Sequence, residues 1–289
     1  MKKSVSVFEV VNYIILAFIG FVSVYPFLYT LTISLSTTAE AVRAGFHLYP
    51  REISLTAYKM VLSNSNIYIG YLNTITRTVL GTAVTVLISA MMAYPLSKKD
   101  MPHVKLFTTL LIITMIFDSG IVPNYLLIKS LKLLNNRLVY VLPGIVAAYN
   151  IIIMKSYFNS LPESISESAK IDGANEAVIL FRIIMPLSVP VLATVALWVA
   201  VGHWNSWLDG VLYVTDNGKQ LLQVFLQRVI TQNQADKMQS GWMSADIRSY
   251  NAETIKSATI IITILPILML YPFLQKYFVK GIALGAVKG

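Results

Sequence analysis

The residues whose types and spacing could support chemistry concentrate in one polar stretch, residues 159–186, which lies between long apolar segments. Within it, Glu163, Glu167 and Lys170 recur at helical spacing, which predicts one charged face of a short helix in a favourable acid-to-base order. Charged side chains on the face of a helix suit docking onto a soluble partner better than they suit the making or breaking of bonds. The stretch is therefore the first candidate for a functional site.

The start of this helix can be predicted from three residues. Ser160 stands three positions before Glu163, the spacing of a capping box, and Pro162 fits the first helical turn. The small side chains of Ser168 and Ala169 should let the helix settle into a shallow groove. The pattern thus predicts a short helix with a defined beginning and a surface that can pack closely.

The end of the helix is predicted at Asp172 and Gly173, because glycine suits the left-handed conformation that closes a helix. Asp172 is then expected to cap a second helix that starts near Ala174 and runs toward Pro186. Together the two helices would form a helix–turn–helix element attached rigidly to the segment that follows. An unspecialised amphipathic connector would show the same local pattern and remains the alternative at this point.

Catalytic chemistry has little support in the rest of the chain. There are no cysteines, and His47, His103 and His203 are too scattered in sequence to suggest a metal site. The sequence contains no phosphate-binding loop of the form Gly-x4-Gly-Lys-Ser/Thr and no plausible catalytic triad. We therefore expect no catalytic residues, no metal site and no cofactor bound by this chain.

The composition points to the bilayer as the solvent of this protein. Of its 289 residues 56% are hydrophobic and only 13% are charged, against about 25% charged in soluble proteins. The net charge of +9 would suggest a nucleic-acid partner for a soluble protein. Here the basic residues lie mostly between apolar segments, so contact with anionic lipid headgroups is the simpler interpretation.

Six segments are long and apolar enough to span a bilayer as helices, which needs about 20 residues each. The first follows Lys2 and Lys3, but its apolar run exceeds that of a signal peptide and no small-x-small cleavage site follows it, so we interpret it as a retained helix. The sequence therefore predicts an all-α membrane protein with six transmembrane helices. The predicted spans are residues 11–35, 70–96, 106–128, 138–158, 187–211 and 255–277.

The orientation of these spans follows only weakly from basic residues. Apart from Arg77, which lies within a span, the 23 Lys and Arg residues divide evenly between the two sides. Lys and Arg are enriched in cytoplasmic segments, and short segments count most. The termini and the tight loop 97–105 therefore favour cytoplasmic N- and C-termini. The large loops 36–69 and 212–254 would then face outward, either as contacts for an external protein or as solvated connectors.

The polar stretch carries a family resemblance. Its pattern of Glu167, Ser168 and Ala169, then Gly173, then Ile183 and Pro186 with Met185 between them, resembles the EAA signature of ABC-importer permeases. Ser168 replaces the second alanine of that signature and Met185 replaces a leucine, and neither change adds bulk or charge. In that family the stretch is a cytoplasmic coupling helix that receives force from an ATPase.

The resemblance covers roughly residues 10–289. Asn73 and Thr74, the run 93–98 and the tail 277–289 resemble the smaller, six-span permease of maltose-type carbohydrate importers. Within that group, the segments 120–130 and 202–209 are most similar to permeases for polysaccharide-derived oligosaccharides of Gram-positive bacteria.

The resemblance implies a fold, a set of partners and a location. The fold would be that of a type I ABC importer permease, with an N-terminal helix and first extracellular loop (1–69), a permease core (70–277) and a cytoplasmic tail (278–289) in a bacterial cell membrane. The partners would be a second homologous permease, an ATPase dimer that holds the ATP and magnesium, and an extracellular solute-binding lipoprotein, besides membrane lipids and without nucleic acid. The permease itself would catalyse no bond change.

The resemblance also assigns roles to individual residues of the polar stretch. The residues expected to couple to the ATPase are Glu163, Glu167, Ser168, Ala169, Lys170, Asp172, Gly173 and Pro186.

Sugar could meet the chain at polar and aromatic residues in or near the spans, where polar groups are costly and usually face a cavity or a partner. Amides and carboxylates bond to sugar hydroxyls, and aromatic rings stack on sugar C–H faces. The same residues could instead lie at a membrane interface or bond to a neighbouring helix. The substrate-path candidates are Asp118, Tyr125, Asn150, Trp204, Asn205, Trp207 and Asp209.

Two other classes of protein compete with this interpretation. An ion-coupled secondary carrier usually shows internal repeats and carboxylates in mid-span, whereas Asp118 and Asp209 lie near predicted span ends and no repeat is evident. A membrane sensor that moves no solute would not need a docking helix between the fourth and fifth spans. An ABC permease for carbohydrate, and within that class for oligosaccharide, is the leading hypothesis.

Overall fold

The computed structural model describes residues 6–117, 119–231 and 252–286, with side chains as far as Met269. These residues form helices joined by short connections, and among them the only strand-like pairing is an isolated bridge between Ser36 and Ile53. The predicted all-α architecture is confirmed. The chain divides into two compact units, residues 1–67 with 225–266 and residues 68–224 with 267–289, and each is described by itself.

The first unit begins with α1 (Val7–Ser34), which a capping box opens. The Ser6 hydroxyl accepts a hydrogen bond from the Phe8 amide at 3.1 Å, and the Ser6 amide donates to Glu9 at 2.9 Å. Both bonds satisfy groups that a helix start leaves open. The other helices of this unit are α2 (Thr38–Ala41), α3 (Thr56–Leu62), most of α13 (Leu222–Thr231) and the first part of α15 (Ala252–Ala286).

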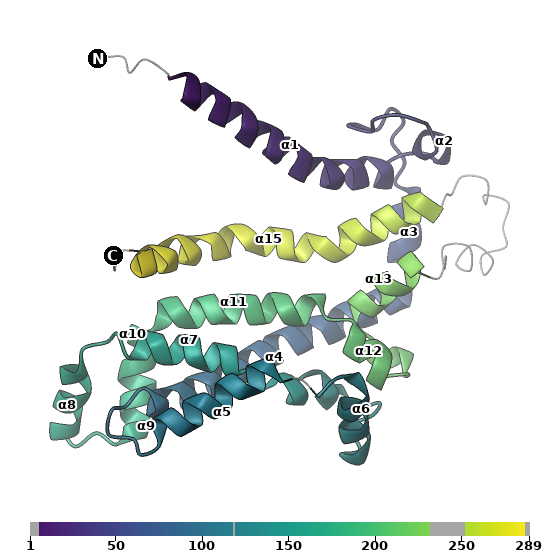
Figure 1. Cartoon of the computed structure of the whole chain (residues 1–289). Coiled ribbons are helices and arrows are strands. Elements are labelled where there is room, and N and C mark those ends of the chain that lie inside the picture. Colours follow the sequence, from purple (N-terminus) through teal and green to yellow (C-terminus); the bar gives the residue numbers. More distant parts are fainter. Residues whose placement is uncertain (1–5, 118, 232–251, 287–289) are drawn as a thin grey trace. The chain divides into compact units, whose positions relative to one another are not determined.

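The second unit contains nearly all of α4 (Ser65–Leu96) and the helices that follow it along the chain (Figure 1). These are α5 (Val104–Ile116), α6 (Ile121–Ser130), η1 (Arg137–Tyr140), η2 (Leu142–Gly144), α7 (Ala148–Phe158), α8 (Glu163–Ile171), α9 (Glu176–Ile179), η3 (Leu180–Ile184), α10 (Met185–Leu187), α11 (Val189–Asn205), α12 (Leu208–Tyr213) and η4 (Asn217–Lys219).

Three helices in the described part of the chain are long and apolar enough to cross a membrane by themselves: α1, α4 and α15 as far as Met269. Three further pairs of helices meet the same criteria of length and composition only when each pair is taken together across a bend of more than 40°. The prediction of continuous helices at 106–128, 138–158 and 187–211 was therefore wrong in this respect. The long apolar helices and the bent pairs together give as many as six spans.

The bends have local causes. Gly120, at a φ of 80°, precedes α6 and separates it from α5. The span predicted at 138–158 begins with the short helices η1 and η2, which meet α7 at 49°. The third bend, of 82°, lies at Ser188 between Glu176–Leu187 and Val189–Asn205. The span predicted at 187–211 also stops at Asn205, where Ser206 is extended before α12 starts at Leu208.

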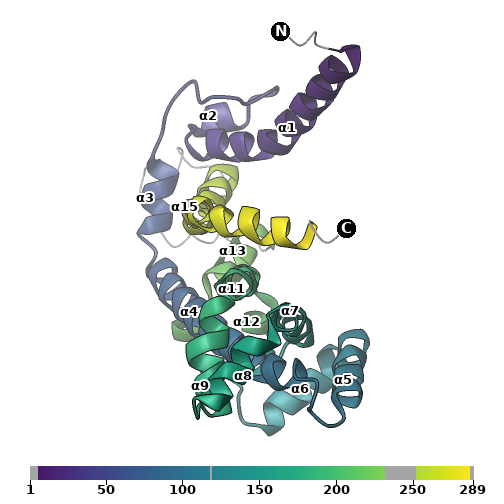
Figure 2. The same cartoon turned by 90° about the vertical axis from the view of Figure 1, so that its left-hand side faces the viewer.

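The main core of the second unit joins α4, α7, α8, α9, η3 and α11. Ala90 and Ala93 of α4 are fully buried against Ile151 and Met154 of α7 and against Val195 of α11. Small residues on α4 let the neighbouring helices approach closely. In Figures 1 and 2, α8 and α9 lie at one end of this unit, and in Figure 1 α6 and α12 lie at the opposite end. The polar stretch is thus separated from the polar residues of α12 by the length of the helices.

Candidate functional site

The helix α8 occupies the polar stretch, but it begins differently from the prediction. Pro162 is the residue before the first helical turn, and no side chain caps it. The Ser160 hydroxyl instead donates a hydrogen bond to the Tyr157 carbonyl at 2.7 Å, at the end of the preceding helix. The predicted capping box was therefore wrong, because Ser160 closes α7 rather than opening α8.

The end of α8 follows the prediction closely. Gly173 has a φ of 81°, in the left-handed region that glycine enters without strain. The Gly173 amide donates to the Lys170 carbonyl at 3.0 Å, and the Ala174 amide donates to the Ala169 carbonyl at 2.9 Å. This pair of bonds is a Schellman motif, which satisfies the last carbonyls of the helix and turns the chain sharply.

The second helix of the element has a different cap from the one predicted. α9 begins at Glu176, and the Asn175 side chain accepts a hydrogen bond from the Val178 amide at 2.9 Å. Asp172 ends α8 and does not cap α9. From α9 the chain continues through the π-helical segment η3 and through α10, which contains Pro186, into α11. The polar stretch is thereby joined to α11 by short helices and a bend of 82° at Ser188.

The faces of α8 have distinct surroundings. Ser166 and Ala169 are buried, and Ala169 belongs to the main core of the second unit. Ser164, Glu167, Ser168 and Ile171 are exposed, and because residues in a helix advance by 100° they form a single outward face. The side chain of Ile171 is 86% exposed, which is unusual for a large apolar residue on so polar a helix. Sequence reasoning missed Ile171, although its position among charged residues was the available signal.

Glu163 and Lys170 neighbour Glu167 around α8, at the i−4 and i+3 positions, and each forms an ion pair with another part of the chain. Lys99, in the loop after α4, lies 2.8 Å from the Glu163 carboxylate. Lys170 lies 2.8 Å from the Glu176 carboxylate across the Gly173 turn. The carboxylate partner raises the pKa of Lys99 and of Lys170 above its usual value. Both pairs attach α8 to its own chain rather than leaving these charges for a partner.

A hydrogen bond extends this arrangement to α4. The Tyr94 hydroxyl donates to Glu176 at 2.6 Å, and the ring of Tyr94 lies under the Lys98 amino group at 4.7 Å. Glu176 therefore accepts from both Lys170 and Tyr94. The position of α8 is linked in this way to the end of a membrane-spanning helix.

The opposite end of the second unit contains a buried ion pair. Arg77 of α4 is 7% exposed and binds the Asp209 carboxylate through both terminal nitrogens, with 3.1 Å between Nη1 and Oδ1. Asp209 also accepts from the Ser206 hydroxyl at 3.0 Å, and the Arg77 Nε donates to the His203 ring at 3.3 Å. Charges out of water need partners of this kind.

Further polar contacts surround this pair. Asn73, the residue singled out at the start of α4, donates to the Gln220 carbonyl at 2.9 Å and accepts from Arg137 at 3.1 Å. The Thr74 hydroxyl accepts from the Leu222 amide at 2.9 Å. These contacts connect α4 to the segment after α12, so Asn73 and Thr74 have structural partners.

The substrate-path candidates are not gathered in one place. Asp118 lies outside the described residues. Asn150 is buried and accepts from the Trp198 indole at 2.7 Å, and Trp204 is buried beside the ring of Tyr71 at 6.3 Å. The ring of Tyr125 stacks on Tyr213 with 6.1 Å between centroids. Asn205 and Trp207 are exposed and Asp209 is paired with Arg77.

Asp209 is the only one of these candidates in the described part of the chain that lines a cavity between α6 and α12. The cavity has a volume of about 290 Å³. Its polar lining also includes Asn124, Ser206 and Tyr213, which were not among the substrate-path candidates. Asn124 was recognisable from the sequence as a polar residue in an apolar segment, whereas Ser206 required knowledge of where α11 ends. Amides, hydroxyls and a tyrosine ring are groups that can bind a polyhydroxylated ligand.

Comparison with known proteins identifies the family. The family model described as the binding-protein-dependent transport system inner membrane component matches residues 66–284. The chain belongs to this family. The match includes Asn73, Thr74, the polar stretch and the segments 93–98, 120–130 and 202–209, on which the resemblance was based, and it ends within the tail 277–289.

Individual members of the binding-protein-dependent transport family are similar over nearly the whole chain. The polygalacturonan/rhamnogalacturonan transport system permease protein YtcP of Bacillus subtilis is 38% identical over 98% of both chains. Protein LplC of the same organism is 40% identical over 99% of this chain and 97% of its own. The arabinooligosaccharides transport system permease protein AraQ of Halalkalibacterium halodurans is 29% identical over 94% of both.

A solved structure has the same fold. It is a chain of a bacterial ABC transporter involved in the import of the acidic polysaccharide alginate, and it is 33% identical with a TM-score of 0.86. The similarity covers 94% of this chain and 96% of that chain. The predicted type I importer permease fold is thereby confirmed. The chain is a membrane protein of the permease class.

Proposed function

We propose that this chain is the transmembrane permease subunit of an ABC importer that takes up an oligosaccharide. The support for a carbohydrate substrate comes from relatives whose names specify polygalacturonan, rhamnogalacturonan, arabino-oligosaccharides or alginate. A second permease would complete the pathway, an ATPase dimer would drive it, and an external binding protein would deliver the sugar. The chain itself would catalyse no bond change, and the ATP and magnesium would be bound by the ATPase.

The observation that carries this proposal is the exposed face of α8. Its four residues remain open to solvent while the opposite face is buried and the flanks are tied by ion pairs. A helix held so firmly, with an exposed isoleucine at its end, is suited to receive a force rather than to serve as a loose connector. We infer that Glu167, Ser168 and Ile171 contact the ATPase.

The other coupling residues would act by positioning this face. Ala169 packs inward, Gly173 makes the turn, and Glu163 and Lys170 fix the flanks. Movement of α8 would pass to α11 through α10, which contains Pro186, and across the bend at Ser188, and to α4 through Glu176 and Tyr94. The membrane-spanning helices α4 and α11 would therefore move together when the ATPase changes conformation.

The sugar would meet the chain at the other end of the second unit. Asn124, Ser206 and Asp209 offer polar atoms at the cavity between α6 and α12, and Tyr213 adds an aromatic ring. Arg77 neutralises Asp209, so the site would present hydrogen-bond acceptors without an uncompensated negative charge. That balance would tolerate the carboxylates of an acidic oligosaccharide. The exposed Trp207 could stack against a sugar face.

The proposal fixes an orientation. If α8 meets a cytoplasmic ATPase, both termini and residues 278–289 lie inside the cell and α12 lies outside. The division into residues 1–69, the core 70–277 and the tail 278–289 stays a prediction.

Co-purification and uptake test the function together. The tagged chain should bring down a second permease and an ATPase in mild detergent. Vesicles that contain this complex and its binding protein should accumulate oligogalacturonides or arabino-oligosaccharides only when ATP is present. Recovery of the chain alone, with uptake that is independent of ATP and driven by an ion gradient, would favour a secondary carrier instead.

A further inference from the structure

Two adjacent cavities lie beside the end of α4 that carries Tyr94. The first, of about 480 Å³, is lined by the end of α4, the loop before α5, and α9 with η3. The second, of about 380 Å³, lies between α4 and α5. Met91, Pro95 and Met101 line both cavities, so the two are neighbours along one side of α4.

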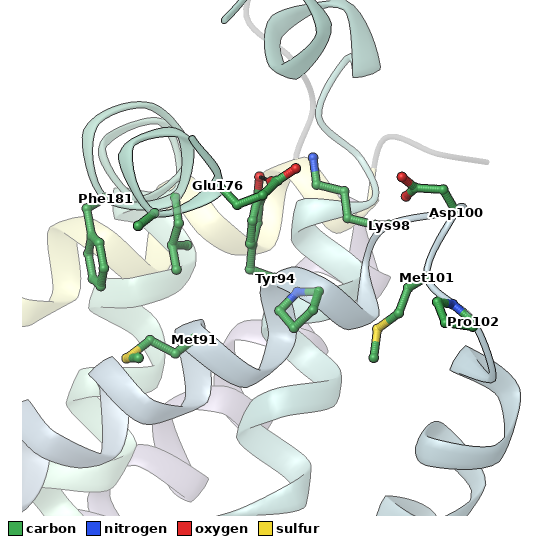
Figure 3. A pocket seen from close by; sticks show the side chains of 11 residues that line it. Met91, Tyr94, Lys98, Asp100, Met101, Pro102, Glu176 and Phe181 are labelled. Atoms are coloured by element: carbon green, nitrogen blue, oxygen red, sulfur yellow. Dashed lines mark hydrogen bonds between the residues drawn. The ribbon is translucent and has the colours of Figure 1, made fainter. Parts of the chain in front are cut away.

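The two cavities differ in chemistry. The first cavity is lined by three charged side chains, those of Lys98, Asp100 and Glu176. Figure 3 shows these side chains toward one side of the cavity, and Met91 and Met101 toward the opposite side. The second is lined by Met92, Leu96, Phe107, Leu110 and Leu111, with Thr114 as its one hydroxyl-bearing residue. Together they run from a charged edge to an apolar groove between two helices. That order matches the headgroup and the acyl chain of a membrane lipid.

The charges select the headgroup. Glu176 already binds Lys170 and Tyr94. Lys98 lies over the ring of Tyr94, and Asp100 stands two residues further on; neither takes part in an ion pair with another described residue. One unpaired cation beside one unpaired anion complements a zwitterion. A purely basic pocket would instead favour an anionic headgroup.

We propose that this groove binds a zwitterionic aminophospholipid, phosphatidylethanolamine. Its phosphate would contact Lys98, its ammonium group would donate hydrogen bonds to Asp100, and one acyl chain would lie in the groove between α4 and α5. Charge-assisted hydrogen bonds of this kind are stronger than neutral ones. A quaternary ammonium headgroup has no N–H to donate and binds less well.

The bound lipid would have a structural consequence. It would lie against Tyr94 and Glu176, the residues that link α8 to α4. Membrane composition could therefore influence the stiffness of that link. The inference does not depend on which solute is transported.

Competition for retained lipid tests the site. The assembled importer, placed in nanodiscs with equal amounts of phosphatidylethanolamine, phosphatidylcholine and phosphatidylglycerol of identical acyl chains, is partly delipidated and analysed by native mass spectrometry. Phosphatidylethanolamine should be the lipid retained. Retention of phosphatidylglycerol in preference, or of no lipid, would overturn the proposal.

Matched variants locate the lipid. Thr114→Trp fills the groove, whereas Met115→Trp introduces the same large ring at the next residue, which lines neither cavity. Asp100→Asn removes the anion, and Lys105→Gln removes a charge at the start of α5, at a residue that lines neither cavity. The Thr114 and Asp100 variants should retain about tenfold less phosphatidylethanolamine, and the other two should match the parent. Equal losses in all four would refute a specific site.

Discussion

Lys170 and Glu176 form an ion pair across the Gly173 turn, with 2.8 Å between Nζ and Oε1. The pair joins the end of the proposed coupling helix α8 to the start of α9, and Glu176 also accepts from Tyr94 of α4 at 2.6 Å. The turn that makes the pairing geometrically accessible depends on a backbone conformation that most residues avoid. The Gly173 turn and these two side-chain contacts therefore link α8, α9 and α4 to one another.

Replacement of Gly173 should impair transport according to the backbone preference of the new residue. A Cβ at this position would meet no atom within 4 Å, so only the φ of 81° penalises a side chain. Gly173→Val should cost about 1–2 kcal/mol and reduce uptake strongly, while Gly173→Asn, which tolerates this conformation, should retain most of it. The measurement is ATP-driven uptake normalised to membrane-inserted protein. Equal activity of the two variants would show that the turn does not matter.

Tyr94→Phe should weaken the link between α8 and α4 without unfolding the protein. The variant keeps the ring under Lys98 and removes only the hydrogen bond to Glu176. We expect the number of sugar molecules moved per ATP to fall roughly threefold to tenfold. Tyr157→Phe is the matched control, since no hydrogen bond of the Tyr157 hydroxyl to the described residues is found. An unchanged ratio in Tyr94→Phe would place force transmission elsewhere.

The Arg77–Asp209 pair should show strong coupling between its members. Asp209→Asn leaves Arg77 buried without a counter-charge, which should destabilise the fold by about 3 kcal/mol. Arg77→Met alone should be similarly damaging, whereas the double variant should recover much of the loss because no charge stays buried alone. Thermal unfolding of the two single variants, the double variant and the parent measures the coupling between the two side chains. Additive losses would mean that the two side chains stabilise the fold independently.

The ion pairs of α8 should be insensitive to pH over the range in which cells live. Glu176 raises the pKa of Lys170 above 10.5, and Glu163 does the same for Lys99. A raised lysine pKa stabilises the folded state fully below the unfolded value and loses that contribution only as pH rises through the folded value. Between about pH 6 and pH 9 the uptake profile of Lys170→Gln should therefore run parallel to that of the parent. Profiles that diverge between these pH values would contradict the conclusion that Lys170 and Glu176 stay charged and paired over this range.

Local patterns in the sequence sufficed to predict the turn of the polar stretch but not its caps. Gly173 adopts the predicted conformation because its preference is intrinsic to the backbone. Ser160 and Asp172 failed as predicted caps because a short polar side chain can serve the helix before it or the helix after it. Only the folded chain decides between these choices.

Contacts between distant segments could not be predicted from periodicity. Arg77 and Asp209 are 132 residues apart, and the sequence indicated only that a charge within a span needs a partner. The same holds for Glu163, whose partner Lys99 lies on another loop. Helical spacing places Glu163, Glu167 and Lys170 next to one another on α8, but only the folded chain shows that Lys99 and Glu176 bind two of them.

The most direct test of the coupling role uses the absence of cysteine from the chain. Ser168→Cys and Ile171→Cys place a unique thiol on the exposed face of α8, and Ser166→Cys places one on the buried face as a matched control. In the assembled importer, a short thiol-directed photocrosslinker should join the first two variants to the ATPase and should fail with the third. Crosslinking from Ser166→Cys alone, or from none of the three, would contradict the account.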